Sequence, residues 1–261
     1  MTNGTAVRTE IVIDGVAKRF GSGRSTTTAL DEIGLTIGQG EFVSVIGPSG
    51  CGKSTLLRVI AGLEKPSAGA VSIGGVAPAV LAAQRRLGVA FQDHALLPWL
   101  DVTKNVALPF RIAGRPVDQA RVADLIALVG LSGFERSRPK HLSGGMRQRA
   151  SIARALALSP EVLLLDEPFG ALDAVTRRRL NRELETIWTR TKVTTLLITH
   201  DVEEAVLLSD HVVVMTPRPG RIRHIETIDL DRPRSGDRMR QDGFHHVVDR
   251  LTAMLDEDVA P

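Results

Sequence analysis

The stretch Gly47–Thr55 (GPSGCGKST) combines glycines, a lysine and a hydroxyl at a spacing that can hold a nucleotide. In the pattern Gly-x4-Gly-Lys-Ser, the glycines let the backbone turn several N–H groups toward one phosphate group, and the positive end of the following helix adds to the attraction. Lys53 is placed to reach the β- and γ-phosphates, and Ser54 to bind Mg²⁺. The alternative is a glycine-rich turn without a ligand. The predicted ATP-binding residues are Gly47, Pro48, Ser49, Gly50, Cys51, Gly52, Lys53, Ser54 and Thr55.

Two carboxylates, Asp166 and Glu167, follow the apolar run Leu163–Leu165. In open α/β sheets, ligands bind beyond the carboxyl ends of the strands. We expect Asp166 to face Mg²⁺ and Glu167 to polarise an attacking water as a general base. The alternative is a pair of solvated residues where a strand meets a loop.

Apolar runs and amphipathic segments alternate along the chain and indicate an α/β fold with a mainly parallel sheet covered on both faces. Period-2 apolar positions near the N-terminus predict two further strands. The predicted strands include 42–46, 70–75, 87–91, 162–165, 194–199 and 211–215, and the predicted helices include 53–61, 173–190 and 202–208.

A helical pattern interrupts this alternation between about residues 95 and 142. In Asp118–Gly130 the apolar residues follow helical spacing, with Asp118 as the cap and Gly130 as the stop. The predicted organisation is an ATP-binding domain over 10–225 with a helical subdomain inserted at about 95–158. A C-terminal tail over 226–261 is expected to hold a final helix near 244–255.

Composition limits the partners and the location. Lys plus Arg is 33 and Asp plus Glu is 30, a net charge of +3, which predicts no nucleic-acid partner. The single cysteine, Cys51, excludes an intramolecular disulfide and fits a reducing compartment. The N-terminus lacks the apolar region of a signal peptide, and the uncharged stretch 68–83 is too short to span a bilayer. A membrane function would therefore need another chain.

A further motif distinguishes among phosphate-loop proteins: Leu142–Arg149 (LSGGMRQR) resembles the signature sequence of ABC-type ATPases. The other motifs of that family also occur in order. Gln92 resembles the Q-loop glutamine, and 171–173 (ALD) resembles the D-loop. His200 resembles the switch histidine, and Phe20 the aromatic residue that stacks on adenine.

This resemblance implies a P-loop NTPase fold with an N-terminal antiparallel β-subdomain and a dimer that holds two ATP molecules between its subunits. Ser143, Gly144 and Gly145, ahead of a helix over about 146–158, would then act on the partner's ATP. Asp173 would belong to the D-loop, Gln92 would contact the metal, and His200 would contact the γ-phosphate.

Several assignments have plain structural alternatives. His200 or Phe20 could simply pack. Met146 stands where the family most often has glutamine, at a side chain that is not expected to contact phosphate. For Cys51, beside a helix N-terminus, we expect a lowered thiol pKa and alkylation that blocks ATP binding; the alternative is a small residue tolerated in the loop.

Local runs resemble one branch of the family, the ATP-binding subunits of nitrate, sulfonate and taurine-type importers. These runs are 96–99 (LLPW), 167–173 (EPFGALD) and 215–222 (MTPRPGRI). The branch implies a permease, an indirect solute-binding protein and a peripheral place on the cytoplasmic face of the membrane. Trp99 and its neighbours would lie where a permease helix docks, or else pack in the core. A thiamine-pathway pyrimidine remains an alternative solute.

Two other classes of protein remain as alternatives. A non-transport ABC ATPase of DNA repair would carry long coiled coils, and the segment between Lys53 and Ser143 shows no sustained heptads. Ribosomal members usually carry two ATPase domains in one chain. A kinase or GTPase would leave Leu142–Arg149 and His200 without a role.

Overall fold

The centre of the molecule is a six-stranded sheet that is parallel except at one edge. The computed structural model describes residues 9–21, 26–170, 172–234 and 239–257. The strand order is β5-β6-β7-β3-β8-β9. Strands β5 to β8 run parallel, and β9 joins β8 antiparallel, so the predicted mainly parallel sheet is confirmed. The bounds are β3 (Phe42–Ile46), β5 (Leu87–Ala90), β6 (Val162–Asp166), β7 (Thr194–Ile198), β8 (His211–Met215) and β9 (Ile222–Thr227).

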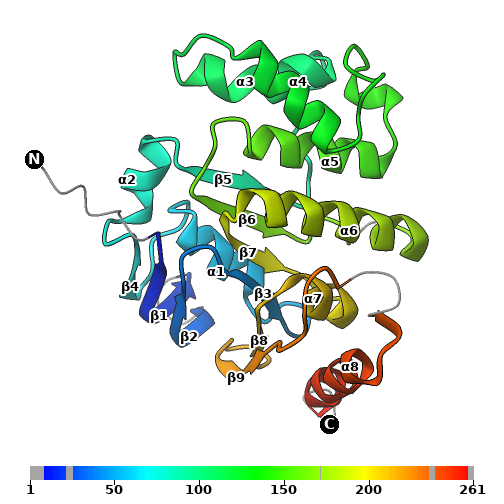
Figure 1. The fold of residues 1–261 in the computed structure, drawn as a ribbon. Coiled ribbons are helices and arrows are strands. Elements are labelled where there is room, and N and C mark those ends of the chain that lie inside the picture. The colour runs from blue at the N-terminus through cyan, green and yellow to red at the C-terminus, as the bar shows by residue number, and fades with distance from the viewer. Residues whose placement is uncertain (1–8, 22–25, 171, 235–238, 258–261) are drawn as a thin grey trace, which may run out of the picture.

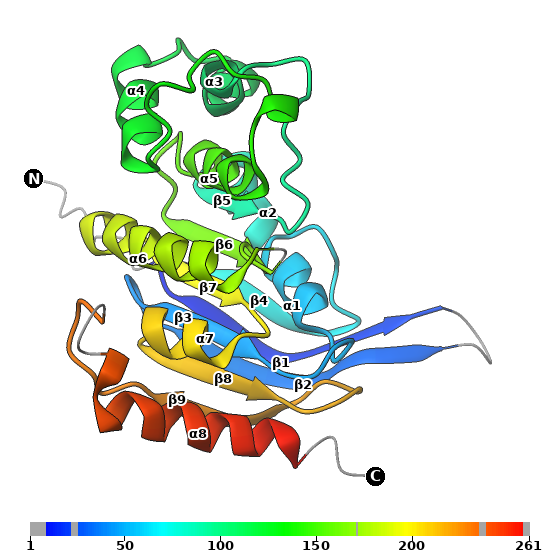
Figure 2. The same cartoon turned by 90° about the vertical axis from the view of Figure 1, so that its right-hand side faces the viewer.

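Helices cover both faces of this sheet. Helix α1 (Lys53–Ile60) packs on one face, and α6 (Ala174–Thr191) and α7 (Val202–Leu208) pack on the other. Helix α8 (Asp242–Asp256), in the predicted tail, packs against α7 at the end of the molecule opposite to the helices between β5 and β6 (Figures 1 and 2). None of the helices in the described part of the chain combines the length and the apolar character of a membrane span.

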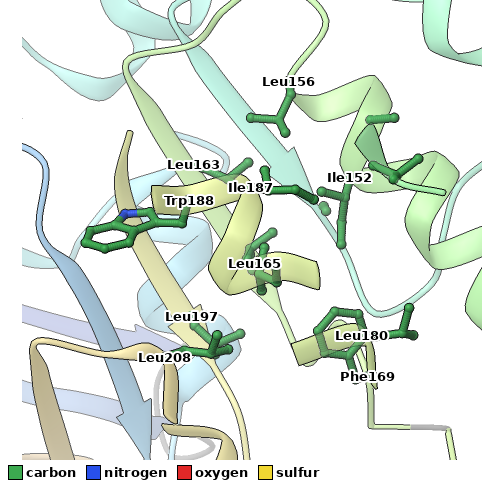
Figure 3. Packing of buried hydrophobic residues seen from close by; sticks show 14 of the residues in the cluster. Ile152, Leu156, Leu163, Leu165, Phe169, Leu180, Ile187, Trp188, Leu197 and Leu208 are labelled. Atoms are coloured by element: carbon green, nitrogen blue, oxygen red, sulfur yellow. The ribbon is translucent and has the colours of Figure 1, made fainter. Parts of the chain in front are cut away.

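Successive side chains of the buried strands enter two separate cores. Leu163 and Leu165 pack with Trp188 of α6 in the core on one face (Figure 3). Leu164 and Leu196 belong to the core under α1. Because both faces are covered, the strands read as continuous apolar runs rather than as alternating ones. The carboxyl ends of these rigid strands carry the residues that were predicted to do chemistry.

A second, three-stranded sheet has the order β2-β1-β4 and is antiparallel throughout. Its strands are β1 (Ile11–Phe20), β2 (Thr27–Ile37) and β4 (Ala68–Ile73). The predicted period-2 positions are confirmed, because Ile11 pairs with Ile37 and both are fully buried. Apolar side chains of this sheet share the core of α1, which ties the sheet to the start of the phosphate loop.

Between β5 and β6 the chain forms α3 (Val102–Ile112), α4 (Gln119–Leu128), the short 3-10 helix η1 (Pro139–His141) and α5 (Gly144–Ala155). These helices gather at one end of the molecule (Figure 1). Asp118 caps α4 as predicted, since its side chain accepts a hydrogen bond from the Arg121 amide. The helical pattern begins later than residue 95, because the buried Asn105 side chain hydrogen-bonds to backbone atoms of residues 97, 100 and 101 and holds them as a loop.

Two elements, one helix and one strand, were not expected from the sequence. Helix α2 (Pro78–Ala83) is a short helix that Pro78 begins. Strand β9 alternates half-buried and exposed residues at the sheet edge, so its apolar pattern is weak. Both lie at the periphery, where burial gives little signal in the sequence.

Candidate functional site

The phosphate loop connects β3 to α1 in a conformation that requires its glycines. Gly52 has φ 111°, and a Cβ atom there would lie 2.8 Å from the Ala29 carbonyl oxygen. At Gly47 a Cβ atom would lie 2.9 Å from the Met215 carbonyl oxygen. Strands β2 and β8 therefore approach the loop too closely for side chains at these two positions. Of the remaining loop residues, Ser49 is exposed and Thr55 is half-buried.

Lys53 lies inside the loop and is 6% exposed. Its ammonium donates hydrogen bonds to the carbonyl oxygens of Gly47, at 2.7 Å, and Pro48, at 3.0 Å. Lys53 is also the first residue of α1, so its charge and the positive end of the helix act at the same place. The arrangement can hold an anionic phosphate group.

Ser54 and Asp166 meet across the loop. The Ser54 hydroxyl donates to the Asp166 carboxylate over 2.9 Å, which joins the start of α1 to the carboxyl end of β6. Burial raises the pKa of Asp166, although the Ser54 hydrogen bond and Lys53 act in the opposite direction. The two oxygen side chains also line a cavity with Gln92, whose side chain is exposed.

Glu167 and His200 form a second pair, at the ends of two adjacent strands. The His200 Nδ1 atom lies 3.2 Å from the Glu167 Oε2 atom. Gly170 keeps this pair uncovered, because a Cβ atom at Gly170 would lie 3.2 Å from Glu167 Oε2 and 3.3 Å from the His200 ring. The His200 side chain is half exposed, so the pair borders solvent.

Arg177, which no sequence motif indicated, holds the two sides of this pair together. Its guanidinium donates to the carboxylate of Asp201 at 2.7 Å, and to the carbonyl oxygens of Phe169 at 3.3 Å and Leu172 at 3.0 Å. One side chain thus links the loops that follow β6 and β7. The only local signal was an arginine one turn after the cap Asp173.

Three contacts fix the loop that follows Gln92. Arg154 of α5 donates to the carbonyl oxygens of His94, at 2.9 Å, and Ala95, at 2.7 Å. His94 Nδ1 lies 2.6 Å from the buried Gln148 side-chain oxygen. The cavity beside Ser54 is therefore connected mechanically to the helical region.

The residues that resemble a signature sequence stand at the start of α5. Ser143 caps the helix by accepting a hydrogen bond from the Met146 amide at 3.3 Å. The expected helix start at Met146 is wrong, because this cap lets the helix begin at Gly144. A Cβ atom at Gly145 would contact Leu180 at 3.3 Å. Gly145 thus lies against α6, whereas the neighbours of the phosphate loop include β2, β6 and β8.

Asp173 caps α6 and accepts hydrogen bonds from the amides of Val175, at 3.1 Å, and Thr176, at 3.0 Å. These bonds lower the pKa of the Asp173 carboxyl. Ala171, the first residue of the predicted D-loop, lies outside the described residues.

Phe20 ends β1 with a half-exposed ring, and the Lys18 ammonium lies 4.9 Å from the ring centroid. No measured contact places this ring against the phosphate loop within the described ranges. The stacking role of Phe20 therefore stays a prediction.

Cys51 differs from the expectation of a reactive thiol. The residue is 1% exposed, and burial raises the pKa of its thiol even though Lys53 acts to lower it. The sulfur points toward Gly47 and Lys53, where solvent does not reach it. The predicted lowered pKa is wrong, since burial outweighs the nearby positive charge.

Comparisons with known proteins find ATP-binding proteins of ABC transporters. A family model described as ABC transporter matches residues 30–170. An uncharacterized ABC transporter ATP-binding protein of Methanocaldococcus jannaschii is 48% identical over 87% of this chain and 85% of that protein. The aliphatic sulfonates import ATP-binding protein SsuB of Bacillus cereus is 45% identical over 86% of this chain and 88% of its own length. The taurine import ATP-binding protein TauB of Burkholderia pseudomallei is 48% identical over 82% of both chains.

Two solved structures of an ABC transporter cassette are also similar to this chain. The dimeric structure of a bacterial ABC transporter cassette aligns with a TM-score of 0.74 and 33% identity, over 84% of this chain and 98% of that one. A post-hydrolysis state of the same cassette, bound to ADP and Pi, aligns with a TM-score of 0.73 and 32% identity, with the same coverage.

Proposed function

This chain belongs to the ABC transporter family, and we propose that its ATPase activity drives the import of an organic sulfonate through a separate permease. The observation that carries the proposal is the meeting of two side-chain pairs at the phosphate loop. Ser54 with Asp166 offers oxygen atoms to a metal, and Glu167 with His200 offers a base and its partner. Both pairs stand at the carboxyl ends of parallel strands, where α/β proteins bind their ligands.

The phosphates of ATP would be held by Lys53, by the amides of residues 47–52 and by the N-terminal end of α1. Hydroxyl, carboxylate and amide oxygens are the donors that Mg²⁺ prefers, so Ser54, Asp166 and Gln92 fit this ion. When bound with ATP, Mg²⁺ neutralises charge that develops on the phosphates.

Glu167 would accept a proton from the attacking water, and His200 would keep the Glu167 carboxylate oriented. Replacement of Glu167 by Gln removes the base but keeps the shape and the contact with His200. We expect Glu167→Gln to lower ATP turnover by about 10²-fold or more and to form a dimer that ATP stabilises.

A phosphate-release assay and gel filtration with and without ATP test this prediction. Glu203→Gln, which changes an exposed carboxylate on α7, is the matched control and should retain wild-type turnover. A monomeric Glu167→Gln protein with wild-type turnover would contradict the proposed role.

Ser143, Gly144 and Gly145 would complete the site of a second copy of the chain. In one chain Gly145 is buried against Thr176 and Leu180 of α6. Gly144 is half-buried and would leave the positive end of α5 open to an incoming γ-phosphate. Asp173, at the start of α6, would lie in the same interface.

The permease would dock at an apolar groove between the helical region and the sheet. The groove shares Leu63 and Phe91 with the cavity that Ser54, Gln92 and Asp166 line. A permease helix in this groove would sense the nucleotide through the loop after Gln92. Such a partner would hold the chain on the cytoplasmic face of the membrane, and a solute-binding protein would act only through the permease.

The names of two relatives support a sulfonate as the solute. Aliphatic sulfonates and taurine share a sulfonate group, and both names occur among proteins that align over more than four fifths of this chain. Reconstitution of the chain with its permease tests this assignment: a sulfonate supplied with the solute-binding protein should stimulate ATPase activity, while nitrate and a pyrimidine should not.

A further inference from the structure

The turn between β8 and β9, residues 216–221, lies against the outer side of the phosphate loop. Gly220 approaches the loop so closely that a Cβ atom there would lie 2.1 Å from the Cys51 carbonyl oxygen. Its own amide donates to the Ala29 carbonyl at 3.0 Å, and its carbonyl accepts from the Asp31 amide at 3.0 Å. The turn is therefore fixed between β2 and the phosphate loop.

Arg218 extends this contact with its side chain. The Nε and Nη2 atoms of its guanidinium donate to the Gly50 carbonyl oxygen at 3.2 Å and 3.1 Å. Gly50 has φ 75°, so the chain reverses at the residue that Arg218 contacts. A charged donor makes a stronger hydrogen bond to a carbonyl than a neutral one does.

A loop that turns its N–H groups inward toward an anion turns carbonyl groups away from it, and those carbonyls need donors of their own. Lys53 supplies donors to the carbonyls of Gly47 and Pro48 from inside the loop. Arg218 supplies them to the carbonyl of Gly50 from outside. Two cations thus hold successive parts of the loop, and only Lys53 belongs to the loop motif.

We propose that Arg218 is a positioning residue for the nucleotide. Its guanidinium fixes the Gly50 peptide so that the amides of the phosphate loop stay aimed at the phosphates, and its charge adds to the attraction for a nucleoside triphosphate. This inference rests on the proposed ATP site. It gives a role to Arg218 in the run 215–222, for which the family resemblance alone implied no role.

Arg221 offers a matched control in the same turn. Its guanidinium pairs with Asp31 of β2, with the Nε atom 3.1 Å from the carboxylate. Loss of Arg221 removes one positive charge and one contact of the turn, as loss of Arg218 does. Only Arg218 contacts Gly50, so the two variants separate a role at the phosphate loop from a general role in holding the turn.

The test compares wild type, Arg218→Ala, Arg218→Lys and Arg221→Ala by calorimetric titration with Mg²⁺ and ATP and by ATPase rates over a range of ATP concentrations. Arg218→Ala should raise Kd and KM for ATP about fivefold, because one charged hydrogen bond is lost. Its kcat at saturating ATP should stay within about twofold of wild type, since the reacting groups are untouched. Arg218→Lys should restore most of the affinity, and Arg221→Ala should bind ATP as wild type does.

Wild-type affinity in Arg218→Ala, or equal weakening in Arg221→Ala, would overturn the proposal. If Arg218→Ala does not fold, Arg218→Met keeps most of the aliphatic part of the side chain, has neither charge nor donor for Gly50, and carries the same expected rise in Kd. Failure of the wild-type chain to bind ATP at all would instead refute the proposed function, so the two outcomes are distinguishable.

Discussion

Glu204 is a buried carboxyl group in α7, four residues after His200 in the chain. It is 3% exposed in the first turn of α7, and it accepts a hydrogen bond from the Thr199 hydroxyl. Its other carboxyl oxygen is buried without a partner among the described residues. Burial raises the pKa of Glu204 to about 7 from the ordinary value of 4.5, and the charge of Asp201 adds to the rise, while the Thr199 bond, Arg177 and Asn181 act to lower it.

This shift predicts that the free energy of unfolding falls as pH rises through the window from 4.5 to about 7. In that window the folded chain holds a proton on Glu204 that the unfolded chain has released, so raising the pH favours the unfolded state. The slope from this group is at most about 1.4 kcal/mol per pH unit. Glu204→Gln cannot titrate and should become more stable relative to wild type as pH rises, with the gain complete above pH 7.

Denaturant unfolding of wild type and variants between pH 5 and pH 8 measures this difference. Glu203→Gln is the control, because Glu203 is exposed on the same turn of α7 and loses the same charge. A Glu204→Gln difference that does not change with pH would show that Glu204 is ionised in the folded chain.

At the same scale, the residues of local motifs could be predicted and their distant partners could not. The roles proposed for Gly47–Ser54 and Glu167 depend on the backbone turn or strand end that carries them, so the sequence around them is informative. Arg218 contacts a residue 168 positions away in the chain. Such pairs depend on how β8 and β3 lie in the sheet, which no local pattern contains.

Elements with strong apolar periodicity were predicted within a few residues, because covered strands and amphipathic helices leave a clear pattern. The loop before α3 was predicted as helix, since the buried Asn105 looks like any polar residue in the sequence. Its side chain takes the hydrogen bonds that helical backbone would otherwise make.

That loop leads to a prediction about assembly. Trp99 is 65% exposed, whereas Leu96 packs against the core, so only part of the apolar run is left for a partner. We expect Trp99→Ala to keep wild-type ATP binding in the isolated chain and to weaken assembly with the permease, because exposed aromatic side chains often anchor interfaces. Co-purification with the permease and ATP titration measure the two properties.

Ile225→Ala serves as the control for this prediction. Ile225 is also exposed, but it lies on β9, at the sheet edge opposite to β5 and the helical region. Normal co-purification and transport by Trp99→Ala would contradict a contact between Trp99 and the permease.

At the scale of the whole molecule, the phosphate loop and the start of α5 belong to different parts of the chain. The loop lies against β2, β6, β8 and the turn that follows β8, while Gly144 and Gly145 lie beside Leu172, Thr176 and Leu180. Together with the dimeric cassette to which the chain is similar, this separation supports a site built from two copies. Two chains that each lack a different half of the site should then pair with each other when ATP is present.

The experiment mixes a tagged chain carrying Gly144→Asp and Glu167→Gln with an untagged Lys53→Ala chain. At Gly144 a Cβ atom would make ordinary contact with Leu172 at 3.5 Å, so aspartate fits the fold. An acid at a helix start suits the helix and repels a phosphate. Only the mixed dimer has a complete site, from the tagged chain's phosphate loop and the untagged chain's Ser143–Gly145. We expect the tag to retain the untagged chain with ATP and to lose it without ATP.

The matched control places Lys53→Ala and Gly144→Asp together in the untagged chain and leaves only Glu167→Gln in the tagged one. The same three substitutions are present, yet neither site of a mixed dimer is complete, because the intact phosphate loop faces Asp at position 144 and the intact α5 faces a loop without its lysine. The tag should therefore not retain the untagged chain. Equal retention in the two arrangements would mean that each chain closes its own site, and the two-copy site would be wrong.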